Sequence, residues 1–375
     1  MMNDDKDNAL KAQISKTITR EYYLDYAKVS SIIFMILVHV FWKFGSNFDD
    51  PTGYTINYYL GGFMAAPVFM TAMGLGFSLT KNNDPKQFIE RGTSILVLGY
   101  IFNFLRELPI AIYEIITSGY STVAKEIWSQ VFQGDILQFA GLAMILFGLF
   151  KKIKLSNNNI LIIGCLMSLA GSLIPTIFSD SIIFNATAGL FIFIDYPEET
   201  IMCFPLLTWF VYPAFGYWIS NALHDKEKTF KITLIPCFLI ALIGSIYEMK
   251  YSVFMMHSNS EYYHMYSHDA LISLCYVVFC FGFFFFVCKH LKEKTNHFIS
   301  SLSNALNLIY IVHWLIISVL QLVFVNILCV EFSNIEGFCL TIVITLVSLY
   351  LGVHFKKIIK KKIDQAPSNV LRYLR

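Results

Sequence analysis

The sequence predicts an all-α, polytopic integral membrane protein with about ten transmembrane helices and both termini in the cytoplasm. Composition is the first observation: the chain is 56% hydrophobic and 14% charged, with a mean hydropathy of +0.58. Soluble domains are nearer about 45–50% apolar and about 25% charged. Repeated apolar runs of roughly 20 residues, the length that crosses a bilayer core, are the second observation. The third is the alternation of basic residues between the connecting segments.

The apolar runs define the expected spans and leave no separate soluble domain. We expect spans at 23–43, 57–80, 92–113, 135–151, 159–178, 203–221, 230–248, 268–288, 304–327 and 336–355. The segment 180–195 is too short and broken for a span, so we interpret it as interfacial or re-entrant. The organisation is then an N-terminal tail (1–21), a transmembrane domain (22–355) and a basic C-terminal tail (356–375).

The basic residues give the expected orientation. The two tails and the even-numbered loops hold 23 of the 28 Lys and Arg residues, four fall on the other side, and Lys28 lies within the first span. By the positive-inside rule both termini are cytoplasmic, and we expect the plasma membrane as the location. The run "KKIIKKK" (356–362) has two interpretations, a topology signal or a contact with anionic lipid.

The first span carries three titratable residues, Asp25, Lys28 and His39. At 100° per residue, Lys28 and His39 differ by about 20° around the helix axis, and Asp25 lies about 60° to the other side of Lys28. The stripe should face the protein interior because charge in lipid is costly. Lys28 and His39 are about 16 Å apart along the axis. This layout suits a channel that admits a cytoplasmic donor to a site reachable from outside. Alternatively, Lys28 snorkels and pairs with Asp25, while His39 bonds a neighbouring helix.

The pattern of this span resembles that of the membrane acyltransferase superfamily, comprising the acyltransferase-3 family and relatives of the heparan-α-glucosaminide N-acetyltransferase type. In "YLDYAKVSSIIFMILVH", Leu24-Asp25 is followed by a basic residue at 28, ten further residues and His39. Arg20 supplies the leading basic residue. Lys28 departs from the usual arginine, and lysine cannot grip a phosphate or carboxylate in planar bidentate fashion.

Later segments extend the resemblance in order along nearly the whole chain. They are "GGFMAAPVFMTAMGLGFSLT" (61–80), "FIERGTSILVLGYIFNFLRELP" (88–109), "GDILQFAGLAMILFGLFKK" (134–152), "FPLLTWFVYPAFGYWI" (204–219) and "SNALNLIYIVHWLI" (303–316), the last with a Tyr-x-x-His pattern. The resemblance implies transfer of an acyl group, expected to be acetyl, from cytoplasmic acyl-CoA. The implied acceptor is a hydroxyl or amine of a sugar, cell-surface glycan or related small molecule.

The resemblance also implies the partners. Acetyl-CoA is the expected donor substrate, a carbohydrate or other small molecule the acceptor, and the lipid bilayer the surroundings. A homo-oligomer is possible, and we expect no nucleic-acid partner. No metal is expected, because the eight cysteines lie almost all in apolar runs without a CxxC pair and are typical of buried hydrophobes.

His39 is the candidate base that takes the acceptor's proton, since an imidazole titrates near neutral pH. An acyl-histidine intermediate is the open alternative. Arg20, Lys28 and Arg91 are the candidate cations for the CoA phosphates, although Arg20 and Arg91 also serve as topology charges. Asp25, assigned to the substrate-binding group, is expected to orient Lys28 or Arg20.

A second polar set lies at about the depth of His39. Glu107 is the first candidate carboxylate to fix the tautomer of His39 and support its imidazolium, and Asp135 is the second. Arg106 and Gln138 are assigned to substrate binding, with a plain interfacial Arg106–Glu107 pair as the alternative.

The late span adds two candidates. Tyr310 is assigned to substrate binding. The resemblance places His313 toward the core near the donor tunnel, whereas the simpler interpretation is a buried hydrogen bond between helices.

Two segments each have two interpretations, and the functional class also has alternatives. The small residues of 61–76 indicate either close helix packing or a passage for the pantetheine arm. The Tyr- and His-rich segment 249–267 suits either sugar stacking or an aromatic membrane belt. A transporter or flippase, or a catalytically inactive receptor or scaffold, are the rival classes.

Overall fold

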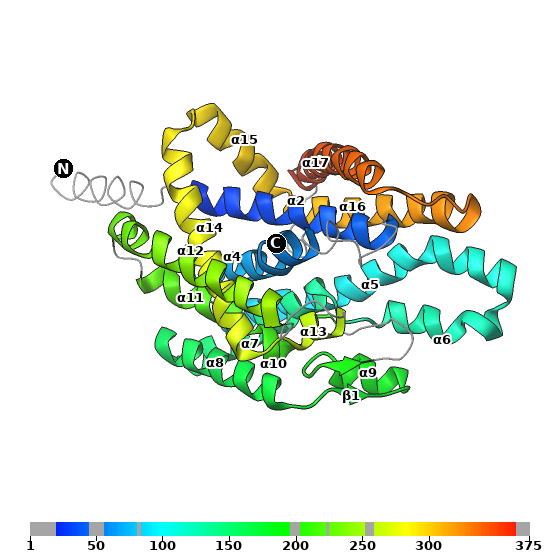
Figure 1. The fold of residues 1–375 in the computed structure, drawn as a ribbon, viewed down its shortest axis with the longest axis horizontal. Helices are drawn as coiled ribbons and strands as arrows, with labels where there is room; N and C mark the ends of the chain where they lie inside the picture. Colours follow the sequence, from blue (N-terminus) through cyan, green and yellow to red (C-terminus); the bar gives the residue numbers. More distant parts are fainter. Residues whose placement is uncertain are drawn as a thin grey trace.

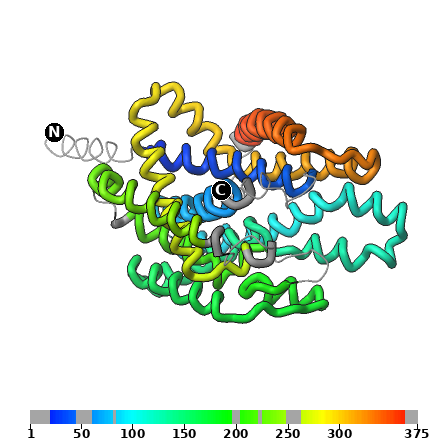
Figure 2. The backbone as a smooth tube through the Cα atoms, viewed as in Figure 1, coloured from blue at the N-terminus to red at the C-terminus, as the bar shows by residue number. Residues whose placement is uncertain are grey.

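The computed structural model describes residues 20–44, 56–80, 84–195, 203–222, 225–251 and 259–364. It is mostly helical, at 85%. Figures 1 and 2 show helices from distant parts of the chain packed lengthwise beside one another, with α2 (Tyr22–Phe44) along the middle. This arrangement agrees with the expected all-α class.

Seven helical segments among the described residues are long and apolar enough to cross a membrane. They are α2, the segment Leu60–Leu79 that joins the π-helix η1 (Ile56–Phe63) to α4 (Ala66–Leu79), α5 (Pro85–Ser118), α12 (Lys226–Tyr251), α14 (Ser267–His290), α16 (Leu306–Gln321) with the π-helix η2 (Leu322–Ile327), and α17 (Asn334–Asp364). Each of them overlaps an expected span.

The other three expected spans are helical but shorter or broken. Helix α7 (Ile136–Lys152) follows α6 (Tyr120–Val131) with a bend of 41°, and this pair counts as an eighth span if it crosses as one. The remaining two correspond to α8 (Asn157–Leu173) and to α10 (Leu206–Trp209) followed by α11 (Val211–Ala222). The count of ten and the orientation of the termini therefore stay predictions.

Short elements connect the long helices. Helix α9 (Ile182–Ala188) lies between β1 (Ile177–Phe178) and β2 (Ile194–Asp195), which pair in parallel, so the end of the segment 180–195 returns to lie beside β1. Helices α13 (Asn259–His264) and α15 (Glu293–Asn304) precede and follow α14.

Glycines set the closest helix contacts. A Cβ at Gly92 of α5 would lie 2.7 Å from the carbonyl oxygen of Gly141 in α7, and a Cβ at Gly74 of α4 would overlap the backbone of Pro213 in α11. Such positions let two backbones approach without a side chain between them. For Gly74, the structure supports the packing interpretation of 61–76.

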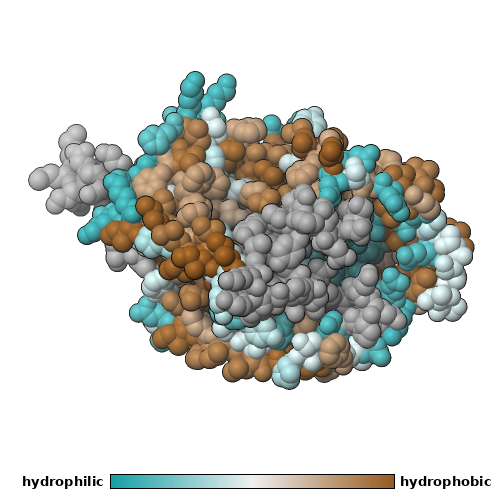
Figure 3. Space-filling view, in the orientation of Figure 1, coloured by the Kyte–Doolittle hydropathy of each residue, from teal (hydrophilic) through white to brown (hydrophobic). Residues whose placement is uncertain are grey.

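Apolar side chains cover the outside of the bundle. Figure 3 shows them in brown over α12, where Ile235 and Ile243 are among the exposed residues. Helix α2, by contrast, contacts α4, α14, α15, α16 and α17. Its polar stripe is thereby kept from lipid, because neighbouring helices surround it. Among the three stripe residues, Asp25 is buried, and Lys28 and His39 are half-buried.

Candidate functional site

Helices α2 and α16 bring two histidines together near the middle of the bundle. His39 Nδ1 lies 3.0 Å from His313 Nε2, and His313 Nδ1 lies 3.2 Å from the backbone oxygen of Ile309. His313 is fully buried, whereas His39 keeps some exposure. The two rings are nearly parallel, at 4°.

The hydrogen bonds assign the tautomers of this pair. A carbonyl oxygen only accepts, so His313 Nδ1–H is the donor to Ile309. In a neutral His313, Nε2 is then an acceptor, and His39 Nδ1–H donates to it. The lone pair of His39 therefore resides on Nε2, the nitrogen that points away from the pair. An imidazole held in this form is prepared to take a proton at one defined atom.

Trp314 connects the histidine pair to a buried arginine. Its ring lies 4.1 Å from the ring of His39, centroid to centroid. The guanidinium carbon of Arg106 lies 4.8 Å from the Trp314 centroid. A cation over an indole face is attracted by the ring quadrupole, and burial strengthens that attraction. Trp314 thus separates the imidazole of His39 from a permanent positive charge.

Arg106 is the centre of a buried polar network. Its guanidinium donates to Glu107 at 2.8 Å, to Asp135 at 3.2 Å and to the side-chain oxygen of Gln133 at 3.2 Å. The residue is only 5% exposed. The pair with Glu107 is therefore an internal ion pair, not the plain interfacial pair considered above, because a buried guanidinium requires counter-charges and acceptors around it.

Asp135 has two structural roles at the start of α7. Its side chain accepts from the Ile136 N–H, and Gln138 accepts from the Asp135 N–H, so the two form a capping box. Its other oxygen accepts from Arg106 and from the hydroxyl of Tyr310 at 3.2 Å. Gln138 also packs against Gly99 and is fully buried. Both side chains thus contribute to the helix start in addition to the network.

The expectation that Glu107 or Asp135 orients His39 is corrected by this geometry. The hydrogen bonds of both carboxylates join them to Arg106 and its neighbours. The physical reason is that a buried guanidinium needs counter-charge and acceptors for its N–H groups, and these two carboxylates supply them. His313 makes a buried hydrogen bond between helices, to His39, which agrees with the simpler interpretation of this residue; its place near a donor tunnel stays a prediction.

The other end of α2 holds a second cluster. Arg20 donates to Asp25 at 2.6 and 3.2 Å, and Ser300 donates to Asp25 at 2.7 Å. Arg20 also reaches the backbone oxygen of Ser300 and the side chain of Asn304, both at 3.1 Å. Asp25 therefore orients Arg20, one of its two expected partners, and ties the start of α2 to α15.

Lys28 and Arg91 differ in burial. No hydrogen bond or ion pair joins Lys28 to another residue in the described ranges, although its side chain is half-buried on the inner stripe of α2. Arg91 is exposed on α5 and likewise makes no ion pair there. Lys28 is the better placed of the two to hold an anionic group inside the bundle, about 16 Å along the helix from His39.

The described part of the Tyr- and His-rich segment serves internal packing. The Trp209 ring lies 5.3 Å from Tyr262, and the Phe204 ring lies 5.2 Å from Tyr263. Burial raises the pKa of both tyrosine hydroxyls well above the ordinary value. His264 bonds the backbone oxygen of Ile174 at 2.9 Å. These rings are occupied by protein neighbours, and residues 252–258 lie outside the described ranges.

Trp314, Gln133 and Ser318 are site residues that sequence reasoning missed. Ser318 donates to the backbone oxygen of Arg106. Trp314 follows His313 directly, and Tyr310, His313 and Trp314 share one helix face at i, i+3 and i+4. That spacing is the sequence feature that could have indicated Trp314 as a site residue. Only the packing of α16 against α2 and α5 shows what this face touches.

Comparison with known proteins identifies the family of this chain. A search of curated proteins and a search of solved structures gave no match. The family model described as "Acyltransferase domain", that of the acyltransferase-3 family, matches residues 21–353. The match contains both histidines, Trp314 and the Arg106 network. The chain therefore belongs to the acyltransferase-3 family and is a membrane acyltransferase.

Proposed function

We propose that this protein transfers an acetyl group from cytoplasmic acetyl-CoA to a hydroxyl or amine of a sugar or cell-surface glycan, with His39 as general base. One observation supports the proposal most strongly: His313 holds His39 in the tautomer whose Nε2 is free to accept a proton. A base positioned in this way suits removal of a proton from an attacking hydroxyl.

The proposed reaction has one proton path. The acceptor oxygen attacks the thioester carbonyl carbon while His39 Nε2 takes the hydroxyl proton. The new C–O bond forms, the C–S bond breaks, and the CoA sulfur leaves as a thiolate that receives the proton from His39. His313 accepts the Nδ1–H of His39 throughout, so it supports the imidazolium during the reaction.

The donor is expected to approach from the end of α2 that carries Lys28. Lys28 makes no ion pair with another residue in the described ranges, so its ammonium is available to the CoA phosphates. Arg20, although it is held by Asp25, lies on the same end of the helix. The extended pantetheine arm would then carry the thioester along the inner stripe of α2 toward His39.

The proposal is tested by acetyl transfer in membranes containing the full chain. Radiolabelled acetyl-CoA is supplied, and glycans and lipids are extracted and counted. His39→Ala should lower transfer by about 10²–10⁴-fold, the usual contribution of a general base. His297→Ala is the matched control, because this histidine lies outside the site with a 64% exposed side chain.

The outcomes separate the competing ideas. Loss of labelling in a folded His39→Ala protein, with His297→Ala unchanged, supports the proposal, and the labelled fraction identifies the acceptor class. Equal labelling in both variants would remove His39 from the mechanism. Label retained on the peptide containing His39 would show the acyl-histidine route instead of direct transfer.

A further inference from the structure

Two cations meet at one residue where three helices come together. Helix α15 packs against both α2 and α17, and Figure 1 shows the three helices beside one another. Arg20 donates to the side-chain oxygen of Asn304 at 3.1 Å, and the ammonium of Lys356 donates to the backbone oxygen of the same residue. Asn304 therefore holds a guanidinium and an ammonium next to each other.

The positive charge of this cluster exceeds its negative charge. Asp25 is the carboxylate that pairs with Arg20, and neither Lys28 nor Lys356 makes an ion pair with a residue in the described ranges. Arg20 lies close enough to both ammonium groups to repel them. Three cations beside one carboxylate leave two positive charges uncompensated. An anion bound between these cations would relieve their mutual repulsion.

Both cations at Asn304 keep hydrogen-bond donors for a ligand. The Nε and Nη2 atoms of Arg20 are bonded within the cluster, whereas Nη1 makes no hydrogen bond to a described residue. An ammonium has three N–H donors, and Asn304 accepts one of those of Lys356. The Arg20 side chain is 42% exposed and Lys356 is half-buried, so an anion reaches both from the surface of the bundle.

Lys356 differs from the other lysines of the C-terminal run. It is half-buried, whereas the lysines that follow it are exposed at positions 357, 360, 361 and 362. It also lies three residues beyond residue 353, where the family match ends. The contact of Lys356 with Asn304 is therefore a feature of this chain that the match does not imply.

The spacing along α2 assigns the phosphates of acetyl-CoA to different cations. The pantetheine arm has about 13 bonds from its sulfur to the first phosphorus, and an extended chain advances about 1.2 Å per bond, which gives about 16 Å. Lys28 and His39 are also about 16 Å apart along the helix. A thioester at His39 therefore places the diphosphate near Lys28. The remaining phosphate, on the ribose, then lies farther out, toward Arg20 before the start of α2.

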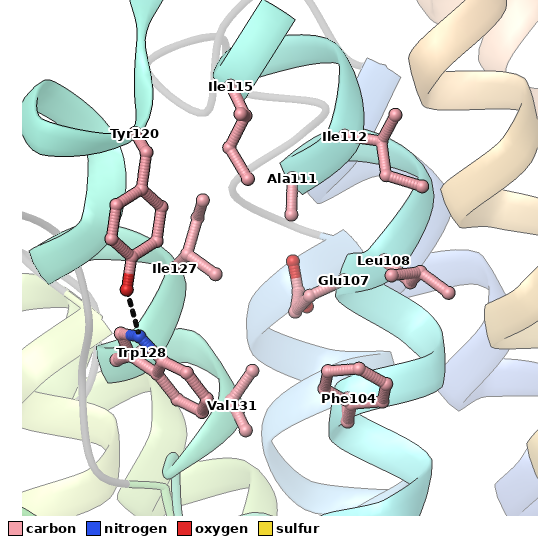
Figure 4. Close-up of a pocket in the computed structure, with 10 residues that line it drawn as sticks. All are labelled: Phe104, Glu107, Leu108, Ala111, Ile112, Ile115, Tyr120, Ile127, Trp128 and Val131. Atoms are coloured by element: carbon pink, nitrogen blue, oxygen red, sulfur yellow. Dashed lines mark hydrogen bonds between the residues drawn. The ribbon is translucent and has the colours of Figure 1, made fainter.

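The cavity between α5 and α6 does not suit this ligand. It has a volume of about 150 Å³, and nine of its ten lining residues are apolar or aromatic (Figure 4). The tenth, Glu107, is a carboxylate paired with Arg106. A phosphate would lose its hydration there and meet a negative group, so the nucleotide is assigned to the cations at Asn304 instead.

We propose that Arg20 and Lys356 bind the 3′-phosphate of the donor nucleotide, while Lys28 contacts its diphosphate. A phosphate monoester carries a charge of about −1.5 to −2 at pH 7 and has three acceptor oxygens, which suits two adjacent cations. The inference rests on the proposed function for acetyl-CoA as the donor. It adds that the C-terminal helix selects a donor with a 3′-phosphate.

The test compares two probes that differ only in this phosphate. Radiolabelled CoA and 3′-dephospho-CoA are bound at equilibrium to the full chain in phosphatidylcholine vesicles. Lys356→Gln should weaken the binding of CoA by about tenfold, as expected for the loss of one charged hydrogen bond, and leave that of 3′-dephospho-CoA unchanged. Lys356→Arg keeps the charge and should bind CoA like the native chain. Unchanged binding of 3′-dephospho-CoA also shows that Lys356→Gln is folded.

Two further variants make the comparison specific. Lys357→Gln removes the adjacent, exposed lysine and should change the binding of neither probe. Lys28→Leu should weaken both probes equally, because both contain the diphosphate. Equal weakening of both probes in Lys356→Gln, or no effect on CoA, would overturn the inference. An effect of Lys356→Gln that appears only in vesicles with anionic phosphatidylglycerol would assign Lys356 to a lipid phosphate and also overturn it.

Acetyl transfer from acetyl-CoA is measured in parallel, so that the two proposals fail separately. CoA binding that depends on Lys356 and the 3′-phosphate, without transfer to any acceptor, supports the phosphate site and overturns the proposed reaction. Transfer that is equally efficient from acetyl-CoA and acetyl-3′-dephospho-CoA overturns the inference while the proposed function stands. Absence of both CoA binding and transfer overturns the two together.

Discussion

Individual polar side chains in this protein are placed inside the membrane domain by partners that satisfy them. Arg106 has two carboxylates and an amide oxygen, and Asp25 has a guanidinium and a hydroxyl. Each isolated charge would cost several kcal/mol in such surroundings, roughly ten or more at the bilayer centre in some estimates. His39 is different because its Nε2 is left for another molecule.

The histidine pair leads to a prediction about His313. His313→Phe removes the acceptor that holds His39, and we expect acetyl transfer to fall by about 10–100-fold, the usual cost of losing an orienting partner. His313→Gln keeps an acceptor oxygen and should recover a large part of the loss. Rates are measured with purified protein in vesicles. Equal activity of the Phe and Gln variants would show that His313 only fills space.

Lys28, which makes no ion pair with another described residue, leads to a prediction about the donor. Lys28→Leu should raise the KM for acetyl-CoA by about tenfold or more while kcat changes little, because a charge-assisted contact to phosphate is lost. Lys28→Arg keeps the charge and should stay near the native value. Steady-state kinetics at saturating acceptor separate the two constants. An unchanged KM in Lys28→Leu would move the phosphate contact elsewhere.

The arginine network leads to a prediction about stability. Arg106→Leu leaves two partly buried carboxylates without their cation, and we expect a loss of about 3–5 kcal/mol in the free energy of unfolding. Thermal unfolding in detergent gives the measurement. Arg91→Leu, on the exposed face of the same helix, should change stability by about 0.5 kcal/mol or less. Similar effects in both variants would contradict the buried network.

Helices in this bundle approach one another where glycine removes the side chain. The contact between α4 and α11 places Gly74 against the backbone of Pro213 and Gly216 against that of Thr71. Gly92 and Gly141 do the same between α5 and α7. These contacts hold the helices that flank the site, since α5 carries Arg106 and Asp135 caps the start of α7.

The glycine contact gives a matched pair of variants. Gly74→Ala forces α4 away from α11 and should destabilise the protein by about 1–3 kcal/mol or more. Gly76→Ala adds the same methyl group where no heavy atom lies within 4 Å, so stability should stay the same or rise slightly. Thermal unfolding of both variants in one detergent is the measurement. Equal loss in both would attribute the effect to the helix backbone instead of the contact.

The orientation of the whole molecule leads to the last prediction. If both termini are cytoplasmic, as the sequence predicts, the turn between η2 and α17 faces outward, and this turn carries the exposed Cys329. A membrane-impermeant maleimide added to intact cells should label Cys329, and Cys329→Ser should lose that label. A cysteine placed at Lys292, between α14 and α15, should react only after the cells are opened. The reverse pattern would invert the topology.

Much of the architecture follows from the sequence alone because it depends on local periodicity and composition. Apolar runs of sufficient length predicted the helices, and the 100° step placed Asp25, Lys28 and His39 on one inward stripe. The pattern of that stripe also indicated the family that the match over 21–353 shows. The span expected from residue 135 and the observed helix α7, which begins at Ile136 after the cap Asp135, differ by one residue at their start.

The sequence alone does not determine the partners of these residues. His39 and His313 are 274 positions apart, and Tyr310 and Asp135 are 175 apart. The residue pattern of one helix predicts which of its faces points inward. It does not indicate which distant helix packs against that face. The carboxylates expected beside His39 belong to Arg106, and Trp314 lies between them and the histidine pair. Those assignments come from the packing of α2, α5 and α16, because hydrogen bonds act only between atoms that the tertiary structure brings within about 3 Å.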